Sequence, residues 1–197
     1  MRIASNLLTL FVFLASSLTA TQAQAVPAPD PAASSSMENK LRYVASNGRA
    51  AHPNPSPTEF TEQEINSYFA SGKVKLPAGV RSVSFRAQPE VVAASAQVDF
   101  DQIKAGRNAG NPLLSMFGGV HTVVVVAHAH GEGGQGFVHV DSVALDGTEI
   151  PPLLLQLFVQ KFVQPKYPDI GIDSRFSLPD QVNSASVGRQ KLTLIQQ

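Results

Sequence analysis

The chain of 197 residues contains no cysteine and no tryptophan, and it has few charged side chains. Without cysteine it cannot form disulfides, thiol nucleophiles, cysteine-ligated zinc sites or a lipid anchor attached through cysteine. Its 15 basic and 15 acidic residues balance. This argues against nucleic acid as a main partner, because phosphate binding needs a basic surplus. Charged residues make up 15% of the chain and apolar ones 43%, so an apolar core can form.

The first 25 residues have the pattern of a secretory signal peptide. Arg2 is followed by the apolar run Leu7–Ala15, and Ala23–Ala25 has the small-x-small form of a cleavage site. Cleavage near Ala25 would leave a chain that begins at Val26. The alternative is a membrane anchor, but the run is shorter than the roughly 20 residues that a span needs. We therefore expect a periplasmic or secreted protein.

Residues 26–57 are rich in Pro, Ala and Ser, which predicts a flexible or extended leader, with a weak indication of a short element at 37–45. The remaining residues, 58–197, are expected to form a single α+β domain. Thr61 and Glu64 fit a capping box, so a short amphipathic helix is predicted over 62–71, ending at Gly72.

Alternating patterns predict a mainly antiparallel sheet. The expected strands cover residues 80–87, 91–100, 121–130 and 137–145, with short closing strands at 176–178, 185–187 and 192–195. Between them, residues 152–163 predict a helix that is apolar almost all round. Such a helix is too short to cross a membrane, so we expect the sheet to wrap around it.

Residues Gly131–Gly136 match the Gly-x-Gly-x-x-Gly pattern of dinucleotide sites. That site requires a helix immediately after the glycines, where its N-terminus meets the pyrophosphate. Here the pattern is followed by a strand that begins at Phe137. The glycines are therefore interpreted as a hairpin connection.

Three histidines fall on the two strands beside this connection. If the hairpin closes symmetrically, His128 lies opposite His139, His130 lies opposite Phe137, and Asp141 is nearby. Such a cluster could hold zinc and leave a water site, as in a metal-dependent hydrolase. A polar outer face of an antiparallel sheet explains the same residues without metal. No Gly-x-Ser-x-Gly motif appears. We expect neither an enzyme nor a cofactor.

The opposite, inward face of the predicted sheet carries many small residues. They leave volume that either the apolar helix or an acyl chain could fill, and packing alone favours the helix. If a ligand binds there, its groove would be lined by Val83, Phe85, Val98, Phe100, Leu154, Phe158 and Phe162.

Four segments also carry a family resemblance: Thr61–Tyr68, Leu76–Val83, Val143–Pro151 and Phe176–Pro179. In this order the chain resembles small bacterial envelope proteins of the LmeA-like and YceB-like kind, which are related in shape to tubular lipid-binding (TULIP) domains. The resemblance covers roughly residues 58–197. It implies a long, curved antiparallel sheet, or half-barrel, wrapped around an apolar helix, with a groove that binds a phospholipid or similar amphiphile. It carries over no catalytic residues.

Together these features predict an exported binding protein for a phospholipid or other apolar ligand, with transient contact to a membrane surface. One alternative is a structural or interaction module of the cell envelope with a solid core and an unknown protein partner. A further alternative is the metal-dependent hydrolase.

Overall fold

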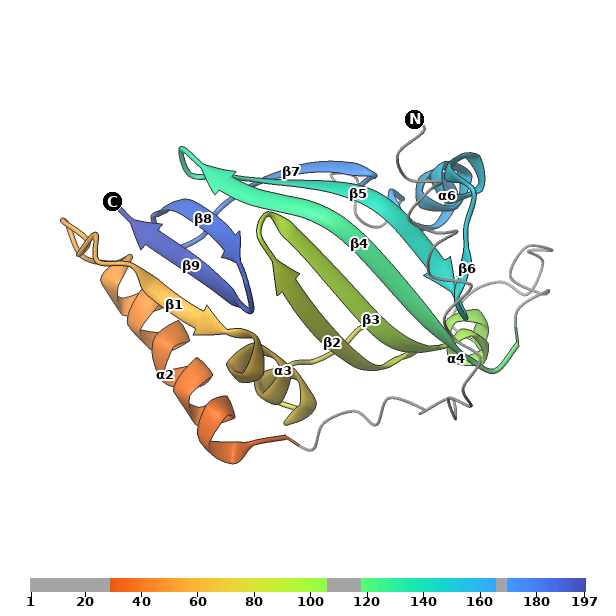
Figure 1. The fold of residues 1–197 in the computed structure, drawn as a ribbon, viewed down its shortest axis with the longest axis horizontal. Helices are drawn as coiled ribbons and strands as arrows, with labels where there is room; N and C mark the ends of the chain where they lie inside the picture. Colours follow the sequence, from red (N-terminus) through yellow and green to blue (C-terminus); the bar gives the residue numbers. More distant parts are fainter. Residues whose placement is uncertain (1–28, 106–117, 166–169) are drawn as a thin grey trace, which may run out of the picture.

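The structure is a computed structural model, and it describes residues 29–105, 118–165 and 170–197. Within these residues the fold is α+β, with a large open antiparallel sheet and few helices (Figure 1), as the sequence predicts. The strands are β1 (Thr58–Thr61), β2 (Val80–Gln88), β3 (Val91–Asp99), β4 (Val120–Glu132), β5 (Gln135–Leu145), β6 (Thr148–Glu149), β7 (Asp173–Ser177), β8 (Val182–Gly188) and β9 (Lys191–Gln196). The helices are α2 (Pro31–Asn47), α3 (Glu62–Ala70), α4 (Phe100–Ala105), α6 (Pro152–Phe158) and the π-helix η1 (Val159–Val163).

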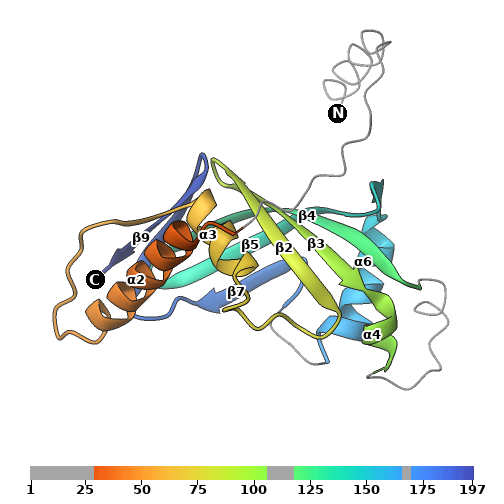
Figure 2. The same ribbon diagram turned by 90° about the horizontal axis from the view of Figure 1, so that it is seen from below.

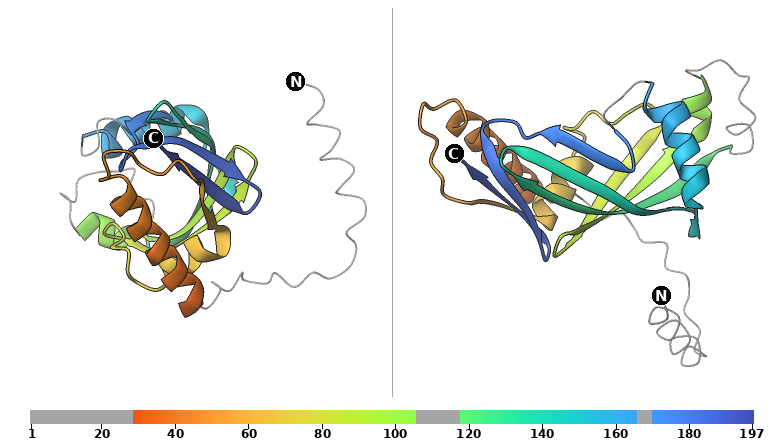
Figure 3. Two further views of the ribbon diagram at one scale, coloured as in Figure 1. Left: turned by 90° about the vertical axis from the view of Figure 1, so that its left-hand side faces the viewer. Right: turned by 90° about the horizontal axis from the view of Figure 1, so that it is seen from above.

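The long hairpin of β4 and β5 joins the two ends of the sheet. One edge of β4 pairs with β3 and, near the hairpin tip, with β8, while its other edge pairs with β5. The strand order is β1-β9-β8-β4-β3-β2, and β6 and β7 pair with the far edge of β5. The sheet curls, and α2 crosses one end of it (Figure 3). Residues 1–28, with the expected signal peptide, lie outside the described part.

A β-bulge changes the side-chain phase of β5. Val126 pairs with Ser142 but Ala127 pairs with Val140, so Asp141 is the extra residue. The apolar pattern changes phase at the same point, from Val138 and Val140 to Val143 and Leu145. Because a strand alternates faces at every residue, the bulge keeps all four apolar side chains on one face.

Helix α2 corrects the expected boundary of the domain. Residues 26–57 were predicted to form a flexible leader, but Pro31–Asn47 is a 17-residue helix. Asp30 caps it by accepting hydrogen bonds from the backbone N–H groups of Ala32 and Ala33, and Pro31 occupies its first turn. The globular part therefore includes residues that the composition assigned to a linker.

A core cluster of buried apolar side chains lies where α2 covers the sheet. Met37 and Val44 of α2 pack with Phe60 of β1 and Val182 of β8. Partly buried apolar side chains surround them: Ile65, Tyr68, Leu178, Leu192 and Leu194. This core belongs to the β1-β9-β8 end of the sheet. Gln196, also buried, ties the helix to β9 by donating hydrogen bonds to the carbonyls of Val44 (2.8 Å) and Asp180 (2.6 Å).

Glu64 links α2 and α3 electrostatically. Its carboxylate accepts hydrogen bonds from Ser36 Oγ (2.5 Å), Lys40 Nζ (2.8 Å) and the backbone N–H of Thr61 (2.8 Å). Burial raises the pKa of Glu64, but these donors outweigh it and bring the pKa down to about 2. The same residue completes the capping box with Thr61, so the predicted helix start is confirmed.

Helix α3 covers part of the open edge of β2. Asn66 donates to the Phe85 carbonyl (2.8 Å) and accepts from the Phe85 N–H (2.7 Å), and Glu62 accepts from the Ala87 N–H (2.8 Å). These side chains make the bonds that a neighbouring strand would make, so this stretch of the edge is protected against strand pairing.

The apolar helix differs most from expectation. It is α6 followed by η1, at the end of the sheet opposite α2 (Figures 1 and 2). Enclosure by the sheet is not confirmed, since Leu153, Leu154 and Leu157 are 69%, 54% and 50% exposed. Among the side chains of this segment that the structure describes, Leu155 and Val159, one turn apart, are half-buried.

Candidate functional site

One face of the β2–β5 region is apolar and only partly covered. Register places Val83 and Phe85 of β2 opposite Ala96 and Ala94 of β3, and these alanines opposite Val123 and Val125 of β4. Val125 in turn faces Val143 of β5. Most of these side chains are half-buried, and Val143 is buried. The same face is covered by helices at the β1-β9-β8 end.

The seven residues expected to line a ligand groove are distributed over three places. Val83, Phe85 and Val98 share the apolar face, and the ring of Phe85 packs edge-on against Phe69 of α3, with ring centroids 5.0 Å apart. Phe100 is buried at the start of α4, with its ring 5.4 Å from that of His121.

The other three predicted residues belong to the apolar helix. Leu154 and Phe158 lie on α6 and are exposed. Phe162 belongs to η1, and its side chain lies outside the described part of the structure. The structure therefore brings three of the seven together on the sheet, while Leu154 and Phe158 lie on α6.

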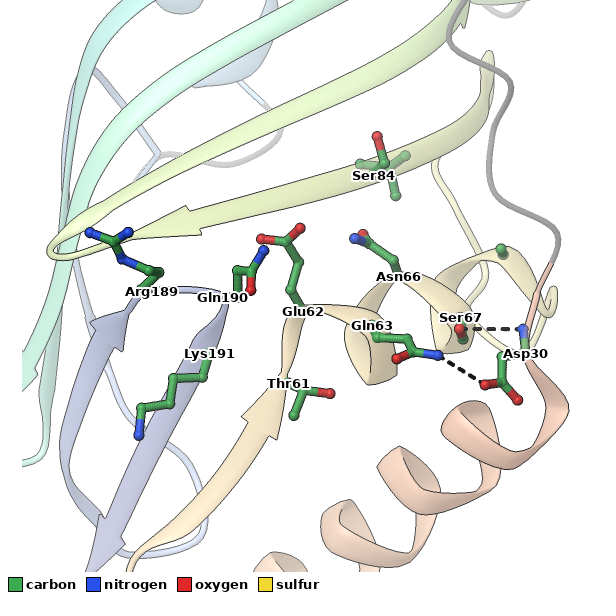
Figure 4. Close-up of a pocket in the computed structure, with 12 residues that line it drawn as sticks. Asp30, Thr61, Glu62, Gln63, Asn66, Ser67, Ser84, Arg189, Gln190 and Lys191 are labelled. Carbon is green, nitrogen blue, oxygen red and sulfur yellow. Dashed lines mark hydrogen bonds between the residues drawn. The ribbon is translucent and has the colours of Figure 1, made fainter.

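A pocket lined mainly by polar residues, and also by Val83 of the expected groove, lies between α3 and β2 (Figure 4). Its volume is about 620 Å³. Glu62 and Asn66 of α3, Ser84 of β2 and Arg189 of the β8–β9 turn contribute to its lining. The turn is held there by hydrogen bonds from the Gln190 N–H to the Ala87 carbonyl (2.9 Å) and from the Glu62 N–H to the Gln190 carbonyl (2.8 Å). Residues this far apart in sequence meet only through the sheet topology, so no local motif could have revealed the pocket.

The histidines occupy the opposite, polar face of the hairpin. The predicted register is confirmed, because His128 pairs with His139 and His130 with Phe137. Nδ1 of His128 lies 2.9 Å from both oxygens of Asp141, and Nδ1 of His139 lies 2.5 Å from Asp173. His130 stacks on Phe137, with 5.0 Å between ring centroids. A second pocket, of about 240 Å³, lies beside these residues.

Two histidines have a raised pKa because each donates a hydrogen bond to a carboxylate. The hydrogen bond that His139 donates to Asp173 raises the pKa of His139, because the carboxylate stabilises the imidazolium. At the other end of β4, the hydrogen bond that His121 donates to Asp146 raises the pKa of His121 in the same way. Each pair orients an imidazole, as a base in hydrolysis would require.

The nucleophile and the metal of a hydrolase lack support. The hydroxyl of Ser174, which lines the second pocket, accepts from the Gly171 N–H (3.0 Å) and donates to the Gly171 carbonyl (3.2 Å). In the described part of the chain, no three or more His, Cys, Asp or Glu side chains are placed to hold a metal ion. The alternative of zinc at His128, His130 and His139 therefore gains no support from the described residues.

Comparison with known proteins adds no relative to this description. No protein-family model, curated protein or solved structure matches the chain. Among residues 29–105, 118–165 and 170–197, no helix is long and apolar enough to cross a membrane.

Proposed function

We propose that the protein is an exported, non-catalytic binding protein for a phospholipid or another apolar ligand. The observation that carries the proposal is the partial cover of the apolar sheet face. At one end α2 and α3 bury this face, but along β2–β5 most of its valines and alanines stay half-buried. Covering this exposed apolar surface with a further apolar layer is favourable, by about 0.8 kcal/mol for each CH₂ group that is buried.

In this proposal the ligand lies against the inner face of the sheet, where the apolar helix over 152–163 was expected. The TULIP-like arrangement then consists of a curved sheet around an acyl chain, with α6 at its end. Small side chains such as Ala94 and Ala96 sit between the larger ones on the apolar face and leave room for the chain. The expected export, to the periplasm or out of the cell, would bring the protein to where such ligands are available.

The test is to identify what the protein carries. Protein recovered from cells that express the full chain is analysed by native mass spectrometry before and after solvent extraction. We expect a phospholipid or fatty-acid mass on the protein that disappears after extraction. A protein free of lipid that also takes up none from added phospholipid would contradict the proposal.

Two alanine substitutions locate the ligand on the sheet. Ala96→Phe fills the apolar face between Val83 and Val123 and should strongly reduce the bound lipid. Ala93→Phe makes the same chemical change on the opposite face, between Arg86 and Val126, and should leave it unchanged. Circular dichroism and thermal unfolding establish that both variants are folded. Equal lipid content in the two folded variants would contradict binding at this face.

A further inference from the structure

The segment formed by α6 and η1 combines exposed leucines with an almost complete lack of charge. Leu153, Leu154 and Leu157 are half to two-thirds exposed and lie on consecutive turns of one helix face. Between residues 150 and 164 the only charged side chain is Lys161. Lys161 is exposed and follows Leu157 by four residues, so it lies one turn further along that face.

We propose that this surface docks the protein on an anionic lipid bilayer. The leucines would enter the boundary between headgroups and acyl chains, and Lys161 would reach the phosphates by extending its long side chain. The proposal rests on the proposed function, because a carrier of membrane lipid has to meet a membrane. Docking by α6 also places the contact at the end of the molecule opposite α2 (Figure 3).

The size of the surface favours a bilayer over a second copy of the chain. Three partly exposed leucines present on the order of 300 Å² of apolar surface. A stable dimer buries about 800 Å² on each partner, so these leucines provide less than half of what is needed. Membrane binding has no such minimum, because its strength increases steadily with the apolar area that is inserted.

The absence of tryptophan allows a direct test of docking. In Leu153→Trp the introduced indole is the only one in the protein, so its fluorescence reports the environment of α6 alone. We expect a blue shift when phosphatidylglycerol vesicles are added, and a smaller shift with phosphatidylcholine vesicles. The matched control is Leu41→Trp on exposed Leu41 of α2, at the other end of the molecule, where no shift is expected.

Binding measurements with variants of the same surface complete the test. Leu153→Ser combined with Leu157→Ser should lower the affinity for phosphatidylglycerol vesicles by about tenfold or more. Lys161→Gln should lower it by about fivefold and reduce the preference for anionic lipid. Because these side chains are exposed, folding should be unaffected, and thermal unfolding of each variant verifies this.

Docking by α6 would be overturned if the indole emission of Leu153→Trp did not shift with either kind of vesicle, or if the double serine variant kept its affinity for vesicles. It would also be overturned if Leu153→Trp were a dimer whose indole emission is already shifted before vesicles are added. Lipid carried by each preparation is measured in parallel. Lipid that stays bound while docking fails would reject only this inference. Docking by a protein that carries no lipid and takes up none from added phospholipid would instead reject the proposed function.

Discussion

At the scale of single residues, Glu64 of α3 links its helix to α2 through hydrogen bonds from Ser36 and Lys40. Three donors converge on a carboxylate that is only 7% exposed. Glu64→Gln removes the charge and leaves Lys40 without its partner, so we expect a loss of about 2 kcal/mol in the free energy of unfolding at neutral pH. Denaturant unfolding measures it. The control is Glu38→Gln, since the side chain of Glu38 is 40% exposed, pairs with Lys73 and should contribute far less.

The pH dependence of this loss has a definite sign. The folded-state pKa of Glu64 is about 2, below its ordinary value of 4.5. A carboxyl with a lowered pKa stabilises the folded state fully above pH 4.5, and this contribution disappears as the pH falls toward 2. The difference between wild type and Glu64→Gln should therefore shrink over that interval. A difference that stays constant down to pH 2 would contradict the assigned pKa.

Gly48 is required for the close approach of α2 to the chain after β7. A Cβ atom added there would lie 2.2 Å from the carbonyl oxygen of Asp180. The φ of Gly48 is −67°, so alanine meets no backbone penalty and the expected loss of about 1–3 kcal/mol is purely steric. Thermal unfolding measures it. Gly72→Asn is the comparison, because Gly72 has open space around it and asparagine tolerates its φ of +75°. Equal stability of Gly48→Ala and wild type would mean that this approach is not required.

At the scale of elements, α2 is a structural part of the domain. Met37 is buried in the core and Leu41, one turn later, is exposed. Met37→Ala should cost about 2–3 kcal/mol in unfolding free energy, whereas Leu41→Ala should cost little. Urea unfolding of both variants measures the difference. If residues 31–47 were a leader outside the domain, the two substitutions would have the same small effect.

The elements also show how far sequence reasoning extends. The start of α3 was predictable because its capping box is local, and so was the hairpin register, because Gly133 and Gly134 close it symmetrically. Helix α2 was indicated only weakly, as a short element at 37–45, because proline and alanine resemble a linker in composition. Its signals were Asp30 before Pro31, together with buried Met37 and Val44 two turns apart.

Two features could not be read from the sequence for different reasons. An apolar helix has the same pattern whether a sheet or a lipid covers it, so the exposure of α6 was not accessible. The pocket beside α3 depends on contacts between residues more than 100 positions apart, such as Glu62 and Gln190. Local periodicity carries no information on such pairs.

At the scale of the whole molecule, packing is uneven along the sheet. The buried core lies under α2, while β2–β5 carry the partly covered face. Native-state hydrogen exchange should therefore be slower in β8 and β9 than in β6 and β7, because local opening follows the density of buried contacts. Added phospholipid should slow exchange in β3–β5 if the ligand covers this face. Uniform exchange over the sheet would contradict the unequal packing.

The bulge at Asp141 has a consequence for the gene. Removing its single codon would bring Val143 and Leu145 into the phase of Val138 and Val140, and every other pair between β4 and β5 would keep its partner. The shortened hairpin should still fold, but without the extra bend and twist that a bulge adds. Deletion of Asp141 would thus change the curvature of the sheet while it leaves the β4–β5 pairing in place. A substitution at this position leaves the number of residues in β5, and so the bulge, unchanged.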